Sequence, residues 1–383
     1  MIVQHLTVGG LRTYGADPLE VDLAPLTLLF GQNSAGKSTL CSILPILQQT
    51  AQHPETLSLT GPMAGGSAFR SAIHDHDLNL PLTLGLGWKG TDHTVRSAAA
   101  EYRWDPDTAR AKRNHLILGT DSDYRTVSGS PAQFTADEAA LVSKFAVEFR
   151  DVLDRSFHLG PMRARPDRTT SLSGIGDNYV GPAGELMTEL LATRPELLTQ
   201  VNRWCDELEL GYRVKVLSPT SEDILATAGD FTVLALEDTR VEPPLLVSPT
   251  AVGYGIGQLL PVITQCCIDS DGIVIIEQPE VHLHPKLQAA VGDLLVDTVT
   301  EGRNQLLLET HSEHLILRLL RRVREGVLNV DDLAILYVDL HEDGAAFIQR
   351  LELDRSGELV DGWPGGFFEE RLTEVLPGLG VDR

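Results

Sequence analysis

Short apolar segments separated by turn residues fill the first 130 residues of the chain and predict β-structure. Residues 2–8 and 19–30 are two such segments, which we expect to pair as strands around a Gly9-Gly10 corner, with a break at Pro25. Later segments alternate apolar and polar positions, which is the pattern of strands with one buried face. They predict an antiparallel meander over residues 82–86, 94–104, 115–118 and 124–127.

The middle of the chain changes to helical spacing. Thr135 and Glu138 have the spacing of a capping box, in which each side chain bonds the backbone N–H of the other residue. Behind them apolar residues recur on one helical face, at Leu141, Phe145, Phe149 and Val152. A second helical block, interrupted at Pro195, and two strands follow. They are predicted over residues 184–210, 212–217 and 231–236.

From residue 250 onward, predicted helices and strands alternate. Helical spacing covers residues 256–268, 287–299 and 313–323, and strands are predicted over 273–276, 306–308 and 333–338. These strands are apolar at nearly every position, which is typical of a parallel sheet covered on both faces. We therefore expect them to share one sheet with the strand that ends at Phe30.

The composition of the chain narrows the cellular compartment and the classes of partner that we expect. At 383 residues, with 42% apolar residues, the chain can bury one large core or two moderate ones. No apolar run approaches the ~20 residues that cross a bilayer, and the N-terminus lacks the pattern of a secretory signal. A net charge of −23 opposes a broad nucleic-acid surface, so any DNA contact must be local or belong to a partner. Cysteines without C-x-x-C spacing predict buried thiols in a reducing cytoplasm; they are Cys41, Cys205, Cys266 and Cys267.

The strongest motif is G-x-x-x-x-G-K-S at residues 31–38 (GQNSAGKS), which lies between an apolar strand and a helical segment. In this setting the backbone N–H groups of the loop and of the helix N-terminus hold phosphate oxygens. Lys37 would neutralise the β- and γ-phosphates, and the Ser38 hydroxyl would bind Mg²⁺. The chain is therefore predicted to bind a nucleoside triphosphate. Pro45 is expected to kink or end the following helix about two turns in.

Two later strands end in polar residues that could complete this site. Residues 272–276 are followed by Glu277, Gln278 and Glu280, at the place where P-loop enzymes position Mg²⁺ and an attacking water. Residues 306–308 precede His311, which could hydrogen-bond a γ-phosphate; alone, it would fit a core or helix-cap histidine better. The long separation from the P-loop suits a head whose two sequence halves close one ATP site.

These segments resemble the motif series of ABC-type ATPase heads, and in particular the OLD/RecF/SMC-like AAA ATPases common in bacterial defence modules. The resemblance is carried by the P-loop and by residues 252–261 (VGYGIGQLLP), 276–285 (IEQPEVHLHP) and 309–314 (ETHSEH). Three further segments resemble a subgroup with a small C-terminal domain of unknown function: 160–168 (GPMRARPDR), 180–185 (VGPAGE) and 361–368 (DGWPGGFF). The implied fold class is α/β: a P-loop ABC-type ATPase head with an antiparallel β lobe, a mainly parallel core sheet and a helical insertion.

Position by position, the resemblance implies a site for ATP and Mg²⁺. Glu277 would take the Walker B place and hold Mg²⁺ together with Ser38, and His311 would be the switch histidine. ATP would contact Gly31, Asn33, Ser34, Ala35, Gly36, Lys37, Ser38 and Thr39. Arg12 and Tyr14 would flank the adenine. Residues 253–258, including Gly255, Gly257 and Gln258, would form the signature segment that meets ATP bound to a second subunit, giving a homodimer through the ATP sites.

The chain departs from this pattern in two places. An ABC head usually has Asp-Glu where this chain has Glu277-Gln278. Because an amide cannot accept a proton at neutral pH, we expect slow hydrolysis. Gln278 would orient the water, or Glu280 would supply the missing carboxylate. Gly257 stands where many relatives have Ser, which removes a hydroxyl donor to the opposing γ-phosphate.

Several charged or metal-ligating side chains admit two interpretations. Arg163, Arg165 and Arg168 fit a solvated loop paired with carboxylates and, equally, a contact with nucleotide or DNA phosphate. The helical arginines favour a solvated face; they are Arg318, Arg321, Arg322 and Arg324. His282 and His284 are read as structural or subunit-facing in preference to metal ligands.

The predicted organisation has four parts. Residues 1–130 hold the P-loop and β lobe, 131–245 a helical and mixed insertion, 246–340 the second half of the head, and 341–383 a small tail domain. The segment beyond Leu340 leaves no room for the Toprim nuclease that OLD proteins carry after the head. We therefore expect a cytoplasmic, slowly hydrolysing ATPase that dimerises around nucleotide and regulates a partner effector in antiphage defence, with a nuclease as the leading candidate.

The alternative function is an SMC/RecF-like DNA-repair ATPase that binds DNA directly. Missing heptad repeats for coiled-coil arms and the acidic charge count against it. A membrane-transporter ATPase subunit is disfavoured by the turn at residues 282–285 and by the tail, so no membrane partner is expected.

Overall fold

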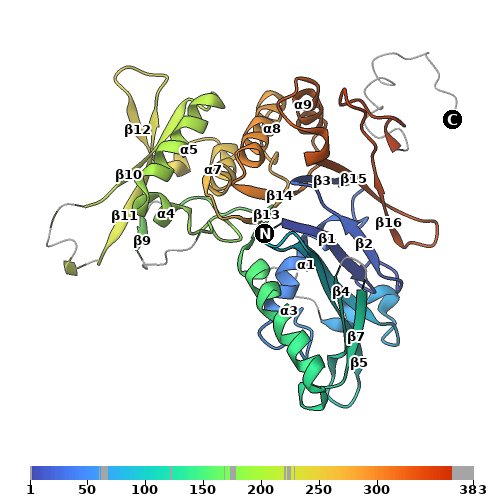
Figure 1. Ribbon diagram of the computed structural model, residues 1–383. Coiled ribbons are helices and arrows are strands. Elements are labelled where there is room, and N and C mark those ends of the chain that lie inside the picture. Colours follow the sequence, from blue (N-terminus) through green and yellow to red (C-terminus); the bar gives the residue numbers. More distant parts are fainter. Residues whose placement is uncertain are drawn as a thin grey trace.

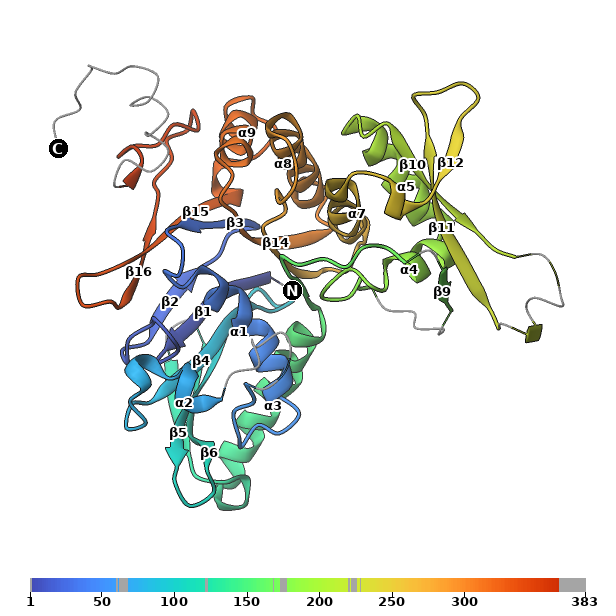
Figure 2. The same cartoon turned by 180° about the vertical axis from the view of Figure 1, so that it is seen from behind.

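The computed structural model describes residues 2–59, 61, 68–120, 123–167, 169–172, 178–219, 221, 226, 227 and 229–364. A mainly parallel sheet lies at the centre of the molecule (Figure 1). An antiparallel β lobe lies on one side of it, and a smaller lobe of helices and strands projects from the other, as Figure 2 shows from behind.

The core sheet has the strand order β16-β15-β3-β14-β13-β8. Neighbouring strands are parallel, except that β16 runs antiparallel to β15. The strands are β3 (Leu26–Gly31), β8 (Ser156–Leu159), β13 (Gly272–Glu277), β14 (Asn304–Glu309), β15 (Leu333–Leu340) and β16 (Ala346–Arg350). Because β3 pairs with both β14 and β15, the P-loop half and the later half share one sheet, as predicted.

The core sheet separates two hydrophobic cores, which explains why its strands are apolar on both faces. In β13, Val274 and Ile276 belong to the core that includes α7, α8 and α9. Ile273 and Ile275 belong to the core that includes α1 and the β lobe. The helices are α1 (Lys37–Thr50), α7 (Tyr254–Cys267), α8 (Pro285–Thr300) and α9 (Glu313–Arg324).

The β lobe is an antiparallel sheet in the order β2-β1-β4-β5-β6-β7. Its strands are β1 (Ile2–Gly9), β2 (Leu19–Asp22), β4 (Leu82–Lys89), β5 (Val95–Asp105), β6 (Arg110–Thr120) and β7 (Asp123–Ser128). The predicted meander and the pairing of the first two strands are confirmed. The break at Pro25 has a structural consequence, because β2 stays in this lobe while β3 enters the core sheet.

Helix α3 (Ala136–Asp154) packs on the β lobe with the predicted capping box and the predicted face. Glu138 N–H donates to Thr135 Oγ1 at 3.3 Å, and Thr135 N–H donates to Glu138 Oε2 at 2.8 Å. Phe145 and Phe149 both meet the Trp88 ring edge to face, with centroids 6.0 Å apart. The helix is therefore held by aromatic packing against β4.

The smaller lobe consists of α4 (Met187–Thr193), α5 (Pro195–Glu207), β9 (Thr169–Ser171), β10 (Tyr212–Leu217), β11 (Phe231–Asp238) and β12 (Leu245–Val247). Strand β11 pairs antiparallel with each of the other three. Pro195 begins α5, where its missing N–H costs nothing, and so the predicted helical block is interrupted at this residue, between α4 and α5. Asn202 ties α5 to β10 by bonding both backbone groups of Val214.

Short elements connect these parts: α2 (Phe69–Ala72), η2 (His74–His76), η3 (Pro131–Gln133), η4 (Pro249–Ala251) and η5 (Val330–Asp332). Within the described ranges, no helix combines the length and the apolar character needed to cross a membrane.

The sequence predicts that Pro45 kinks or ends its helix, and the proline does not end it, because α1 continues to Thr50. Ile43, Leu44 and Ile46 around the proline are fully buried. Burying each such side chain stabilises by about 1.5–3 kcal/mol, so together they outweigh the roughly 3 kcal/mol cost of an internal proline.

Two core strands fall outside the segments predicted to form the head. β8 lies within the predicted insertion at 131–245, and β16 lies within the predicted tail at 341–383. The last four positions of the 361–368 segment and the rest of the tail lie outside the described residues.

Candidate functional site

A polar cavity of about 340 Å³ lies where β3, β13 and β14 end at the same edge of the core sheet. In parallel α/β sheets this carboxyl edge is where ligands bind. The cavity is lined by Arg12, Thr13, Asn33, Ser34, Gly36, Lys37, Ser38, Thr39, Gln278, Glu309 and His311. It therefore unites residues from both ends of the sequence, as the motif series predicts.

The phosphate loop needs its two glycines. Gly31 and Gly36 have φ of +135° and +116°, which residues with a side chain rarely adopt. A Cβ on Gly31 would lie 2.0 Å from Val338 O, and one on Gly36 would lie 2.6 Å from Thr13 Oγ1. The loop thus passes close to β15 on one side and to the Thr13 segment on the other.

Lys37 is the first residue of α1 and is 3% exposed. Its Nζ donates to Gly31 O at 3.0 Å and to Gln32 O at 2.5 Å, so the ammonium group lies inside the curve of the loop. Burial lowers the pKa of Lys37, while the nearby carboxylate of Glu309 opposes that change. The ammonium is positioned beside the cavity that a phosphate would fill.

Glu309 is a site residue that the sequence analysis missed. It ends β14, is 3% exposed, and accepts a hydrogen bond from Ser38 Oγ at 2.7 Å. Burial and the charges of Glu277 and Glu280 raise its pKa, and the bond from Ser38 opposes this. An acidic residue that directly follows the apolar run 306–308 was the available signal.

Glu277 lies beside Glu309 across the β13–β14 pair. Its Oε1 is 2.6 Å from His158 Nε2, which comes from β8 on the other side of β13. No motif marks His158, because the four-residue β8 has no periodic pattern of its own. The sequence analysis therefore missed a partner of its Walker B candidate, whose role in binding Mg²⁺ stays a prediction.

The two candidates for the hydrolytic role lie in different surroundings. Gln278 lines the cavity, with φ of +46° and its N–H donating to Glu309 O at 2.7 Å. Glu280 is 7% exposed, and its Oε1 accepts from the backbone N–H of His311 at 2.7 Å. Burial raises the pKa of Glu280. Only the Gln278 side chain is part of the cavity wall, whereas Glu280 holds the backbone of His311.

His311 is one of the residues that line the cavity. Burial lowers its pKa, and the positive charge of Lys37 lowers it further. Both effects favour the neutral imidazole, in which one ring nitrogen donates a hydrogen bond and the other accepts one.

The two predicted adenine neighbours differ. Arg12 lines the cavity, and its NH1 donates to Thr39 Oγ1 at 3.3 Å. Tyr14 is fully buried under the loop, where its hydroxyl donates to Gly36 O at 3.2 Å. The prediction that Tyr14 flanks the adenine is wrong, because its ring already packs within 2.9 Å of the Cβ position of Gly36.

The predicted signature segment forms the N-terminus of α7. Gly253 and Tyr254 are exposed there, whereas Gly257 and Gln258 are buried. A Cβ on Gly255 would lie 2.5 Å from His282 O, so this glycine allows α7 to approach the turn after β13. Gln258 is 2% exposed and bonds the backbone of Arg163. Its side chain is turned inward, away from the surface that would meet a second subunit.

Within the predicted arginine cluster, Arg163 is not the solvated loop residue that one of the two interpretations expected. Arg163 is 2% exposed, and its guanidinium donates to Glu277 O and Gln278 O. Arg165 lies over the exposed Tyr254 ring at 4.9 Å. Arg168 lies outside the described residues. On α9, the predicted solvated face consists of ion pairs of Arg318, Arg321, Arg322 and Arg324 with Asp293, Glu325 and Glu358.

The two histidines of the 282–285 turn have structural contacts. His284 caps α8, where Nδ1 accepts from Leu287 N–H at 3.3 Å. The exposed His282 meets the Tyr254 ring edge to face, with centroids 4.7 Å apart.

The donor set of the cavity fits a magnesium nucleotide. Backbone N–H groups at the start of α1 and the Lys37 ammonium would hold phosphate oxygens. The Ser38 hydroxyl and the Glu309 carboxylate are adjacent hard oxygen donors, which Mg²⁺ prefers. When bound, the metal would supply charge neutralisation for the phosphates.

Comparisons with known proteins add a family likeness. A family model described as "AAA domain, putative AbiEii toxin, Type IV TA system" matches residues 230–318. This segment includes β13, β14 and the residues from Gln278 to His311, but not the P-loop. None of the curated proteins compared with the chain matches it.

Solved structures resemble nearly the whole chain. One is an SMC head bound to the C-winged helix domain of ScpA, with a TM-score of 0.57 and 13% identity over 93% of this chain and 99% of that chain. Another is the Pyrococcus furiosus Smc head domain with an extended coiled coil, bound to the C-terminal domain of ScpA; its TM-score is 0.53, at 12% identity over 91% of this chain and 96% of that one. The fold is that of an SMC head. This confirms the predicted fold class, an ABC-type head with an antiparallel β lobe and a mainly parallel core sheet.

Proposed function

We propose that this protein binds ATP with Mg²⁺ in the cavity at the P-loop and hydrolyses it slowly. The proposal rests on three strand ends that meet at one cavity. The loop with Lys37 follows β3, Gln278 follows β13, and β14 ends at Glu309, two residues before His311. Charge-neutralising, metal-binding and water-orienting groups then surround one space. The SMC-head fold supports it. The amide of Gln278 in place of a carboxylate is the reason for slow turnover.

We further propose that ATP joins two copies of the chain. One head supplies only part of the contacts to a triphosphate, and the exposed start of α7 at Gly253 and Tyr254 is a second set of backbone donors without an acidic residue in its first turn. Ligand that bridges two copies shifts the equilibrium toward the dimer. In the proposed symmetric dimer, the α7 start of each copy would contact the nucleotide of the other.

The cellular role that we propose is control of a partner effector, such as a nuclease, in antiphage defence within the cytoplasm. The matching family is described as a toxin of a toxin–antitoxin system, and this supports the defence assignment. The alternative is an SMC/RecF-like DNA-repair ATPase, which the likeness to SMC heads favours. Among the helices of the described part of the chain, the longest is α3 with 19 residues, too short for a coiled-coil arm. The net charge of −23 also counts against direct DNA binding.

The dimer can be tested by cross-linking two single-cysteine changes on different copies. Ser34→Cys is nearly isosteric, and at Gly253 a Cβ would meet no atom within 4 Å. Gly257 is unsuitable, since its Cβ would lie 3.3 Å from Pro166. The native cysteines are all buried and do not interfere.

We expect a Ser34→Cys copy mixed with a Gly253→Cys copy to cross-link only with a non-hydrolysable ATP analogue and Mg²⁺. Tyr124→Cys on the β lobe, which is 58% exposed, serves as the negative control partner. Sedimentation of the unmodified protein with and without the analogue separates a nucleotide-driven dimer from a constitutive one. A monomer under both conditions, with no cross-link, would refute the dimer.

A further inference from the structure

Arg163 joins two segments that lie far apart in the sequence. Its backbone is held by α7, because Arg163 N–H donates to Gln258 Oε1 at 3.2 Å and Gln258 Nε2 donates to Arg163 O at 2.7 Å. The side-chain amide of Gln258 therefore hydrogen-bonds both the N–H and the C=O of Arg163. Since Gln258 is itself 2% exposed, this contact is shielded from water.

The side chain of Arg163 reaches the end of β13. NH2 donates to Glu277 O, and NH1 donates to Gln278 O at 3.3 Å. These two carbonyls belong to the residue in the Walker B place and to the residue that lines the cavity. Because Gln278 has φ of +46°, a conformation that non-glycine residues rarely adopt, its backbone needs such an external support.

The buried charge of Arg163 is balanced by carboxylates of the same turn. Burial lowers the pKa of Arg163 to about 10, and the charges of Glu280 and Glu277 oppose this, so the guanidinium is protonated at neutral pH. Glu280 in turn accepts from His311 N–H at 2.7 Å. The one arginine thus touches α7 and the Gln278 turn, and it faces the carboxylate that holds the His311 segment.

We propose that Arg163 is a positioning residue that couples α7 to the turn carrying Gln278 and Glu280. The inference rests on the proposed function, in which the start of α7 meets the ATP of a second copy. A displacement of α7 would move Gln258, then the backbone of Arg163, and then the carbonyls of Glu277 and Gln278. Dimer formation at the start of α7 would thereby position the Gln278 side chain in the ATP cavity of the same copy.

The coupling is testable without nucleotide, by hydrogen exchange on three variants. Gln258→Ala removes the link to α7, Arg163→Lys keeps the charge but loses the forked geometry, and Arg155→Lys is the control. Arg155 is a surface arginine of the preceding segment, paired with Asp271 at 2.8 Å. We expect the first two variants to speed exchange of the Gln278 and His311 amides by about 10-fold or more, on the scale of local opening, while the control leaves both unchanged.

Faster exchange confined to residues next to the substitution, with Gln278 and His311 unchanged, would overturn the coupling. Urea unfolding of each variant distinguishes local opening from global loss of stability. A uniform increase over the whole chain would also count against the proposal, since it indicates a purely structural residue.

The second readout separates binding from turnover. We expect Arg163→Lys to bind a non-hydrolysable ATP analogue within about twofold of the parent and to dimerise normally, but to hydrolyse ATP about 10²-fold more slowly, since small misplacements of a reacting group cost this much. Parental turnover in this variant would refute the proposal. If the parent binds no ATP, the proposed function fails, yet the exchange experiment still decides the coupling.

Discussion

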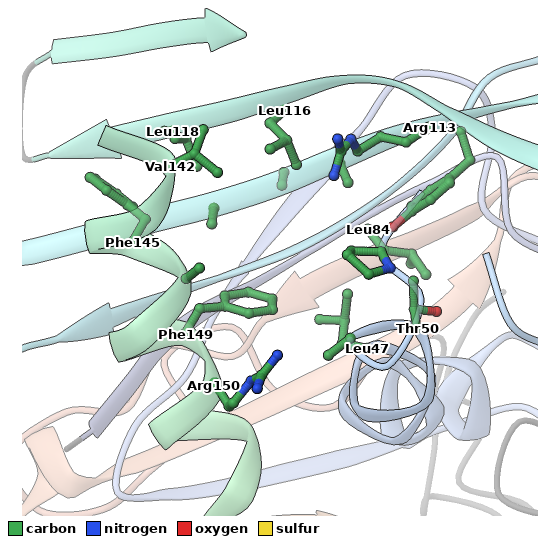
Figure 3. A pocket seen from close by; sticks show the side chains of 17 residues that line it. Leu47, Thr50, Leu84, Arg113, Leu116, Leu118, Val142, Phe145, Phe149 and Arg150 are labelled. Atoms are coloured by element: carbon green, nitrogen blue, oxygen red, sulfur yellow. The ribbon is translucent and has the colours of Figure 1, made fainter. Parts of the chain in front are cut away.

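Helix α1 has a cavity at each end, and the two cavities are opposite in character. At its N-terminus lies the polar cavity with Lys37, Ser38 and Glu309. At its C-terminus lies a cavity of about 180 Å³ between α1, α3 and strands of the β lobe. Figure 3 shows Val142, Phe145 and Phe149 of α3 facing Leu84, Leu116 and Leu118 across it, with Leu47 of α1 below.

The two cavities show that an apolar lining serves packing, whereas buried charged groups mark a cavity with a chemical function. The apolar cavity is lined mainly by side chains that stabilise the β lobe by packing, and the charge of the lining residue Arg113 is paired with Glu55. The polar cavity is lined by the buried charges of Lys37 and Glu309, and burial together with two further buried glutamates, Glu277 and Glu280, raises the pKa of Glu309. Buried charges of this kind cost stability. Buried charges that lower stability in this way are typical of a functional site.

The largest effect is expected at the polar end. Lys37→Ala should abolish ATP binding in calorimetry, because the ammonium compensates the phosphate charge, while the far-ultraviolet spectrum stays that of the folded protein. Lys286→Ala, which removes an exposed lysine paired with Glu209, is the matched control and should bind ATP normally. If Lys37→Ala bound ATP with unchanged affinity, the polar cavity would not be the ATP site, and the functional difference between the two cavities would be lost.

At the apolar end the expected effect is on stability alone. Phe145 is 4% exposed, so Phe145→Ala should lower the free energy of unfolding in urea by about 3–5 kcal/mol. Val147→Ala on the same helix, at a side chain 71% exposed, should change it by less than about 0.5 kcal/mol. ATP affinity should be the same in both variants. An affinity that falls in Phe145→Ala would show that the apolar cavity communicates with the loop through α1.

Restoring a carboxylate in the polar cavity tests which residue acts as the general base. Because Gln278 lines the cavity, Gln278→Glu should raise steady-state phosphate release, by up to roughly 10²-fold for a positioned general base. Glu280→Gln should have a small effect on turnover, since its amide oxygen can still accept from His311 N–H. The reverse pattern, with a damaged Glu280→Gln enzyme and a neutral or harmful Gln278→Glu change, would assign the base to Glu280 and indicate like-charge crowding beside Glu277 and Glu309.

The smallest effect concerns the pH dependence of stability. Burial raises the pKa of Glu280 above that of an unfolded glutamate. A raised pKa gives a contribution that is fully present below the unfolded pKa and is lost as pH rises through the folded value. Glu280→Gln cannot ionise, so its melting temperature should fall less than that of the parent between pH 5 and pH 8, as followed by calorimetry. Parallel curves for the two proteins would contradict the raised pKa of this buried carboxylate.

Local signals were sufficient for the parts of the fold that each segment forms by itself. The capping box at Thr135 fixed the start of α3, and the glycines at positions 31 and 36 identified a loop that no other residue type could form. Continuous apolar runs predicted the central strands, because a strand buried on both faces has no polar positions. These features depend on near neighbours in the chain, so they can be recognised without the tertiary structure.

The short strand β8 and the partners of the site required the fold. His158, Arg163 and Glu309 lie in no periodic pattern, and each acquires its role only when a distant strand or helix is placed beside it. Tyr14 fails in its predicted role for the same reason, since packing under the loop, and not its residue type, decides what its ring contacts.

From the sequence by itself follow the phosphate loop, the apolar strands, the acidic strand end and the α/β class, because each is set by residues within about one element of one another. Only the tertiary structure decided that Ser38 meets Glu309, that Gln278 and not Glu280 lines the cavity, and that Arg163 is buried between α7 and β13. The physical reason is that the pairing of buried polar groups is a long-range property. Which carboxylate, carbonyl or amide a side chain meets depends on strand order and register, and these are set by the packing of the two cores on either side of the sheet.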